Sequence, residues 1–113
     1  MNNWDEVLAF ALALPDAELS TSYGRPAVKV NAKAFVYPGR EVGSFAIASP
    51  LPEKELLMET DPGTFWETAH YRDWPAVLVR YGSADRERIE TVITRAWWDR
   101  LKKPQREAFG DRP

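Results

Sequence analysis

The sequence contains no cysteine and only one histidine among its 113 residues. Without cysteine the chain can form neither disulfide bonds nor thiolate metal sites, and one histidine cannot build a multi-histidine metal site. No apolar run approaches the roughly 20 residues that a membrane-spanning helix needs. Met1–Glu6 has no lysine or arginine, so the N-terminus does not resemble a secretory signal. We therefore expect a cytoplasmic protein without a cofactor or metal.

Catalytic sequence motifs are missing as well. The chain has no glycine-rich dinucleotide or phosphate loop, no Gly-x-Ser-x-Gly elbow and no zinc-protease helix motif. Any serine–histidine pair would have to use His70, which lies in a polar and aromatic segment between two elements. We expect a structural or hydrogen-bonding role for His70, and general-base chemistry is the less favoured alternative. The sequence thus predicts a protein that is not an enzyme.

Local patterns predict an α+β fold. Asn3 followed by Glu6 resembles a capping box, and an apolar stripe follows at helical spacing over residues 4–14. Alternating runs between residues 19 and 48 predict an antiparallel meander, with turns at Asn31-Ala32 and Pro38-Gly39. A later helix, with Leu56 and Leu57 pointing inward, precedes a central strand at 75–81 and a last helix that runs to about Lys103. We expect an antiparallel sheet with helices packed on one face.

The length and composition fit one globular domain, which we place at residues 1–103. Pro104 is expected to end the last helix, and residues 104–113 are expected to form a basic, partly ordered tail.

Charge is distributed unevenly along a chain whose formal net charge is −2. Residues 25–40 hold four basic residues and no acid, and residues 95–113 hold six bases against three acids. Basic residues at hairpin turns are well placed to contact phosphates, although lysines on turns also serve solubility. The candidate DNA-binding residues are Arg25, Lys29, Lys33, Arg40, Lys102 and Lys103.

Aromatic residues provide a second lead, because their number exceeds the obvious needs of one small core. Trp98 falls opposite the apolar stripe of the last helix, so it could be exposed at an interface or covered by the tail through Phe109. The alternative function is therefore a small-ligand or protein-interaction module. Its candidate residues are His70, Tyr71, Trp74 and Trp98.

The order of several short motifs resembles the MmcQ/YjbR family over nearly the whole chain. These motifs are Tyr-Gly-Arg-Pro-Ala-Val-Lys-Val at 23–30, Lys-Ala-Phe at 33–35, His-Tyr-Arg-Asp-Trp-Pro-Ala-Val-Leu-Val at 70–79 and Ala-Trp-Trp at 96–98. The resemblance implies a frataxin-like fold and a "double wing" DNA-binding domain without transferable catalytic residues. The wings would correspond to the hairpin turns around Asn31 and Pro38-Gly39.

We therefore expect a monomer or weak dimer that contacts double-stranded DNA weakly through phosphates, with binding that falls steeply as salt rises. An unidentified protein partner is the alternative.

Overall fold

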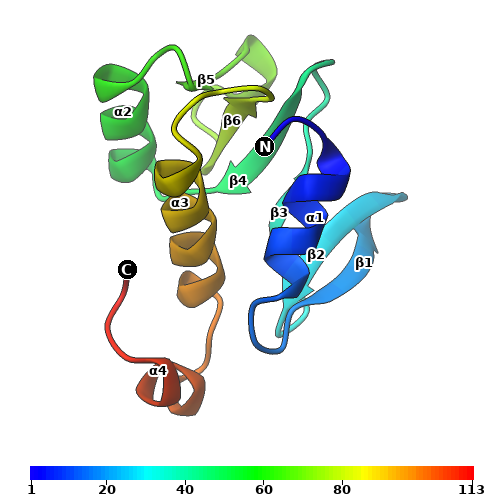
Figure 1. The fold of residues 1–113 in the computed structure, drawn as a ribbon, viewed down its shortest axis with the longest axis vertical. Coiled ribbons are helices and arrows are strands. Elements are labelled where there is room, and N and C mark those ends of the chain that lie inside the picture. The colour runs from blue at the N-terminus through cyan, green and yellow to red at the C-terminus, as the bar shows by residue number, and fades with distance from the viewer.

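The computed structural model describes residues 1–113 and contains four α-helices, one short 3₁₀ helix and six strands (Figure 1). The helices are α1 (Trp4–Leu12), α2 (Leu51–Thr60), α3 (Arg86–Asp99) and α4 (Lys103–Phe109), and the 3₁₀ helix is η1 (Ala69–Tyr71). The strands are β1 (Glu18–Ser22), β2 (Arg25–Val30), β3 (Lys33–Pro38), β4 (Ser44–Ala48), β5 (Phe65–Trp66) and β6 (Ala76–Arg80). No helix is both long and apolar enough to cross a membrane.

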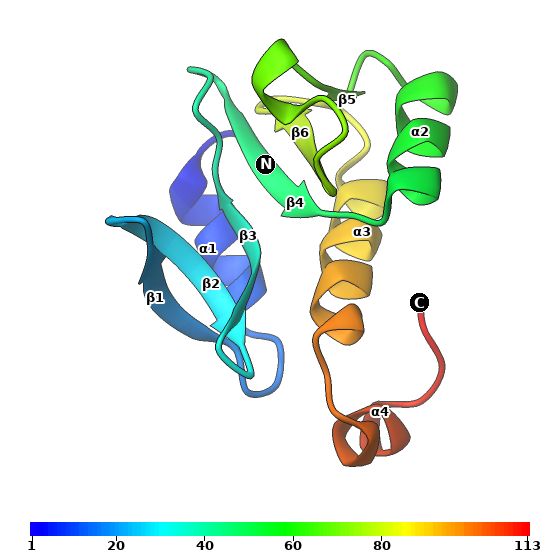
Figure 2. The same cartoon turned by 180° about the vertical axis from the view of Figure 1, so that it is seen from behind.

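All six strands form one antiparallel sheet in the order β1-β2-β3-β4-β6-β5. The predicted meander is confirmed as β1 to β4, and β6 lies between β4 and β5 with Ala76–Val79 fully buried. Helices α1 and α3 cover one face, and α2 stands beside the β5–β6 end (Figures 1 and 2). The predicted α+β fold is therefore correct.

The main core lies between this sheet and helices α1 and α3. Because successive strand residues point to opposite faces, every second side chain of a strand packs against the helices. That set includes Val28, Val30, Phe45, Ile47, Val77 and Val79. Trp97 of α3 is the largest fully buried side chain, and its indole Nε1 donates to the Pro15 carbonyl at 2.9 Å. The opposite face of the sheet carries only a small apolar cluster and has no α-helix over it (Figure 2).

Helix α1 begins as its sequence predicts. The Asn3 side chain accepts from the Glu6 amide at 2.9 Å, and the Glu6 carboxylate accepts from the Asn2 amide. Side-chain acceptors thus satisfy amides that have no partner within the first turn.

Helix α2 differs from its predicted orientation. Leu57 is buried as expected, but Leu56 is 57% exposed and Lys54 is only 1% exposed. Positions three apart share a helix face, so the turn that buries Leu57 also buries Lys54 and leaves Leu56 outside. The prediction that Leu56 points inward was wrong.

The C-terminal segment also differs from expectation. Helix α3 ends at Asp99, and Pro104 lies in the first turn of α4, where its missing N–H is tolerated. The expected basic, partly ordered tail contains a helix over Lys103–Phe109, and Arg112 attaches the end of the chain to Asp99 and Glu53. Phe109 packs edge-on against Trp97 with ring centroids 5.0 Å apart.

Candidate functional site

A cavity of about 540 Å³ opens on the sheet face that α1 and α3 do not cover. Three arginines contribute to its lining, together with five aromatic rings that include His70, and no Asp or Glu contributes. We call this the sheet-face cavity. Its principal side chains are Arg25, Arg40, Arg100, Tyr37, Tyr71 and Trp74.

Arg25 and Arg40 come from two turns at the same end of the sheet. Arg25 begins β2 directly after the Tyr23-Gly24 turn, and Arg40 lies in the turn between β3 and β4. Arg25 Nη2 donates to the Gly39 carbonyl at 3.2 Å, which joins the two turns. A Cβ at Gly39 would lie 3.0 Å from Leu78 Cδ2, so a larger residue would disturb this junction.

Arg100 enters the cavity from the helical layer. It caps the C-terminus of α3, and its Nε donates to the Ala34 carbonyl of β3 at 3.3 Å. Strand β3 pairs with β4 only over Val36–Pro38, so Ala34 lies beyond the paired stretch. The guanidinium of Arg100 therefore reaches the cavity where β3 and β4 have separated.

A buried lysine holds the aromatic wall in place. Lys54 Nζ donates to the carbonyls of Tyr71 at 2.7 Å and Trp74 at 2.9 Å, and it pairs with Glu67 at 2.8 Å. These three contacts use the three donors of an ammonium group. The Tyr71 hydroxyl in turn accepts from the Arg40 amide at 3.3 Å. The segment 67–74 is thus anchored from behind while Trp74 remains 58% exposed.

Tyr37 contributes a neutral hydroxyl to this wall. Burial is the main cause that raises the pKa of Tyr37 above its ordinary value of 10.0, and Tyr71 adds to the increase. Trp74 and Arg100 oppose the increase. The phenol is therefore protonated at neutral pH and can donate a hydrogen bond.

The three arginines have no carboxylate partners. The ion pairs of the molecule use Lys54, Arg86, Arg88, Arg95 and Arg112. Arg40 uses none of its side-chain nitrogens in a hydrogen bond, whereas Arg25 and Arg100 each use one, to a carbonyl. The sheet-face cavity is therefore a concentration of uncompensated positive charge on a chain that is acidic overall.

The predicted basic residues do not form one cluster. Successive turns of a meander lie at opposite ends of the strand they share, so the Asn31-Ala32 turn is roughly 17 Å from the Pro38-Gly39 turn, the length of β3. The turn that does lie beside Arg40 is Tyr23-Gly24. The expectation that the Asn31 turn forms a wing next to Pro38-Gly39 was wrong for this topological reason.

The remaining predicted cations lie elsewhere. Strand alternation puts Lys29 on the same sheet face as Arg25, although Glu18 is its direct neighbour on β1. The Asn31 side chain donates to the Arg100 carbonyl at 2.8 Å and to Gln105 Oε1 at 2.7 Å, so its turn packs against the start of α4. The exposed lysines of that end, Lys33, Lys102 and Lys103, lie away from the cavity.

The aromatic candidates divide in a similar way. His70, Tyr71 and Trp74 all line the sheet-face cavity, but Trp98 does not. The C-terminal segment covers Trp98, whose Nε1 donates to the Gly110 carbonyl at 3.0 Å. The Arg106 guanidinium lies 4.1 Å from the Trp98 ring centroid. Trp98 and segment 65–74 therefore do not form one surface. The C-terminal segment covers the Trp98 indole, as the alternative expected, but it does so through Arg106 rather than Phe109.

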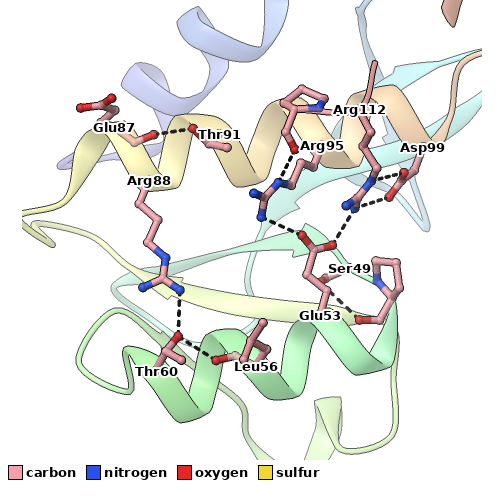
Figure 3. A network of polar contacts seen from close by, with 12 residues as sticks. Ser49, Glu53, Leu56, Thr60, Glu87, Arg88, Thr91, Arg95, Asp99 and Arg112 are labelled. Carbon is pink, nitrogen blue, oxygen red and sulfur yellow. Dashed lines mark hydrogen bonds and ion pairs between the residues drawn. The ribbon is translucent and has the colours of Figure 1, made fainter. Parts of the chain in front are cut away.

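A second polar cavity, of about 550 Å³, lies between α2, α3 and the C-terminal segment. We call it the tail cavity. Arg112 pairs with Asp99 at 2.8 Å and with Glu53 at 2.6 Å, and Arg95 pairs with Glu53 at 3.0 Å (Figure 3). The hydrogen bond to Asp99 is the main cause that raises the pKa of Arg112. These charges clamp the chain end onto α2 and α3 through Glu53 and Asp99.

Comparison with known proteins agrees with this fold. The YjbR family model matches residues 12–98. Uncharacterised proteins of Mycobacterium tuberculosis and Mycobacterium bovis are 29% identical, and each alignment covers 96% of this chain and 96% of the relative. The crystal structure of Deinococcus radiodurans protein DR2400, which has a DUF419 domain, superposes with a TM-score of 0.74 at 14% identity. That superposition covers 97% of this chain and 89% of the Deinococcus chain. The chain described here belongs to the YjbR family.

Proposed function

We propose that this chain is a non-catalytic, cytoplasmic domain that binds double-stranded DNA weakly through the two turns at the mouth of the sheet-face cavity. We call these turns wing 1 (Tyr23–Arg25) and wing 2 (Arg40–Gly43). They replace the pair of turns that the sequence suggested. The double-wing description of the MmcQ/YjbR resemblance supports the proposal, now with the wings at one end of the sheet.

The observation that best supports this proposal is the position of two arginines without ionic partners. Each wing has one exposed arginine without a carboxylate partner, and the Arg25–Gly39 hydrogen bond holds the wings together. Guanidinium groups bind phosphate oxygens well because their planar donors can contact two oxygens at once. Arg25 and Arg40 would contact neighbouring phosphates, and Lys29 would extend the basic face along β2.

The wing tips have an apolar side chain as well as a charge. Tyr23 and Val42 are fully exposed, at positions where no packing within the chain requires them. Apolar side chains at such tips can contact sugars or base edges when the arginines grip the backbone. This combination favours a nucleic-acid groove over a simple solubilising surface.

Salt dependence of binding to a labelled duplex, followed by fluorescence anisotropy, tests the proposal. Two or three phosphate contacts predict a log–log slope of roughly −2 to −3. Arg40→Glu should weaken binding at low salt by at least about tenfold, because it replaces an attraction with a repulsion. Lys33→Glu makes the same charge change at the far end of β3, so it is the matched control and should have little effect. Equal loss in both variants, or no binding of wild type at low salt, would contradict the proposal.

A further inference from the structure

The sheet-face cavity combines two kinds of chemistry that a groove-binding surface alone does not need. Its rim is cationic, with Arg25 and Arg40, and its wall is aromatic, with Trp74 and Tyr37. A nucleotide has the complementary pair of features, a phosphate and a planar base. We propose that the sheet-face cavity binds a single nucleotide, with the phosphate at the arginines and the base against Trp74. For a nucleotide within DNA, this inference rests on the function proposed above.

The dimensions of the cavity suit one such unit. Its volume of about 540 Å³ lies within the range of roughly 300–1,000 Å³ that is usual for small-molecule sites. The wall is also held in one position, since Lys54 fixes the carbonyls of Tyr71 and Trp74. Asp73, with a φ of 59°, makes the tight turn that presents Trp74. A site held in this way needs little reordering when a ligand enters.

The guanidinium groups that line the cavity have hydrogen-bond donors without protein partners, and these donors favour an anionic ligand. Arg25 keeps two guanidinium nitrogens without a protein partner, and Arg40 keeps all three. Arg100 keeps both terminal nitrogens at the inner end of the cavity. No carboxylate lines the space to neutralise these groups. A phosphate would provide the missing acceptors, and the exposed Trp74 ring would be covered by a stacked base.

A base inside an intact duplex is already stacked and cannot lie against Trp74. Binding a base of duplex DNA in the cavity therefore requires the nucleotide to leave the helix, which is easiest where the nucleotide is unpaired. The inference thus predicts a preference for DNA with an unpaired nucleotide over a fully paired duplex. A free nucleoside monophosphate presents the same chemistry without that requirement.

The experiment compares three labelled duplexes that differ at one position: fully paired, with one extra unpaired nucleotide, and with one extra abasic sugar. We expect wild type to bind the unpaired nucleotide about tenfold more tightly than the other two. Trp74→Ala should remove this preference but keep binding to the paired duplex, and Trp74→Phe should restore it. Thermal unfolding of both variants checks that they remain folded.

The outcomes separate this inference from the proposed DNA binding. Equal affinity of wild type for all three duplexes overturns the nucleotide site and leaves DNA binding intact. If no duplex binds, the DNA proposal fails, and titration with a nucleoside monophosphate then decides the inference alone. Binding of the monophosphate that is lost in both Trp74→Ala and Arg40→Gln supports a site for free nucleotides. No binding of the monophosphate, or binding that matches inorganic phosphate and is unchanged in Trp74→Ala, overturns it.

Discussion

Two cavities of almost equal volume lie on either side of Arg100, and three arginines contribute to the lining of each. In the tail cavity, Glu53 and Asp99 contribute to the lining as well, and Arg112 is paired with both. In the sheet-face cavity Arg25 and Arg100 each donate to one backbone carbonyl and the Arg40 side chain donates to none, and aromatic rings take the place of the carboxylates. The comparison shows that arginine content alone does not make a structural clamp. Arginine forms the clamp where carboxylates line the cavity, and without them the arginines have no ionic partner.

The largest effect is expected from the lysine that supports the open cavity. Lys54→Met keeps the length of the side chain but leaves Glu67 and the carbonyls of Tyr71 and Trp74 without their donor. Removing one partner of a buried pair typically costs about 3 kcal/mol or more, so the free energy of unfolding should fall by about 3 kcal/mol. Urea unfolding measures this fall, with the exposed Lys33→Met as control. A loss below about 0.5 kcal/mol, the usual size for surface substitutions, would show that Lys54 does not anchor the wall.

A smaller effect tests the two cavities directly. Arg112→Gln removes a paired charge from the tail cavity, and Arg40→Gln removes an unpaired charge from the sheet-face cavity. Because partly exposed ion pairs contribute little, we expect Arg112→Gln to lower the free energy of unfolding by about 1 kcal/mol without changing DNA binding. Arg40→Gln should leave stability within about 0.5 kcal/mol and weaken binding. If Arg112→Gln weakens DNA binding and Arg40→Gln lowers stability instead, the tail cavity is the binding surface and the sheet-face cavity is the structural one.

The smallest effect concerns Tyr37 at high pH. A folded-state pKa raised above 10.0 means that the folded protein favours the protonated phenol. Its contribution to stability is complete below pH 10 and is lost as the pH rises through the folded-state pKa. Tyr37→Phe should therefore flatten the alkaline decline of the free energy of unfolding, measured in urea at several pH values. Burial raises the pKa of Tyr81 in the same way, so Tyr81→Phe is a second variant with the same expected sign. If the free energy of unfolding falls equally with rising pH in wild type and in Tyr37→Phe, the pKa of Tyr37 is not raised in the folded protein.

Most of the fold could be predicted because its signals are local. The Asn3–Glu6 cap, the helical stripe of α3 and the alternation in β2 and β6 each depend on residues within one element. Pro104 shows the limit of such reasoning. The same proline can follow one helix or open the next, and the packing of Phe109 on Trp97 decides between them.

The candidate site was predicted less completely because it depends on long-range geometry. Arg25, Arg40, His70, Tyr71 and Trp74 were identified, but as members of two competing surfaces rather than one cavity. Arg100 was missed as part of the cavity, since its role depends on where β3 and β4 separate. Lys54 did leave a signal, because it is three residues before the inward Leu57 and so shares its helix face. Consecutive hairpin turns alternate between the two ends of a sheet, and this rule alone places the Asn31-Ala32 turn away from Pro38-Gly39.

The position of Arg100 has a thermodynamic consequence. Its guanidinium is available to a molecule in one cavity, while its carbonyl anchors Asn31 beside the C-terminal helix and its side chain also borders the tail cavity. If occupancy of the sheet-face cavity changes how readily the chain end detaches, detachment must change affinity for the occupant by the same factor. Arg100 would then couple the sheet-face cavity to the C-terminal segment, without any hinge or moving domain.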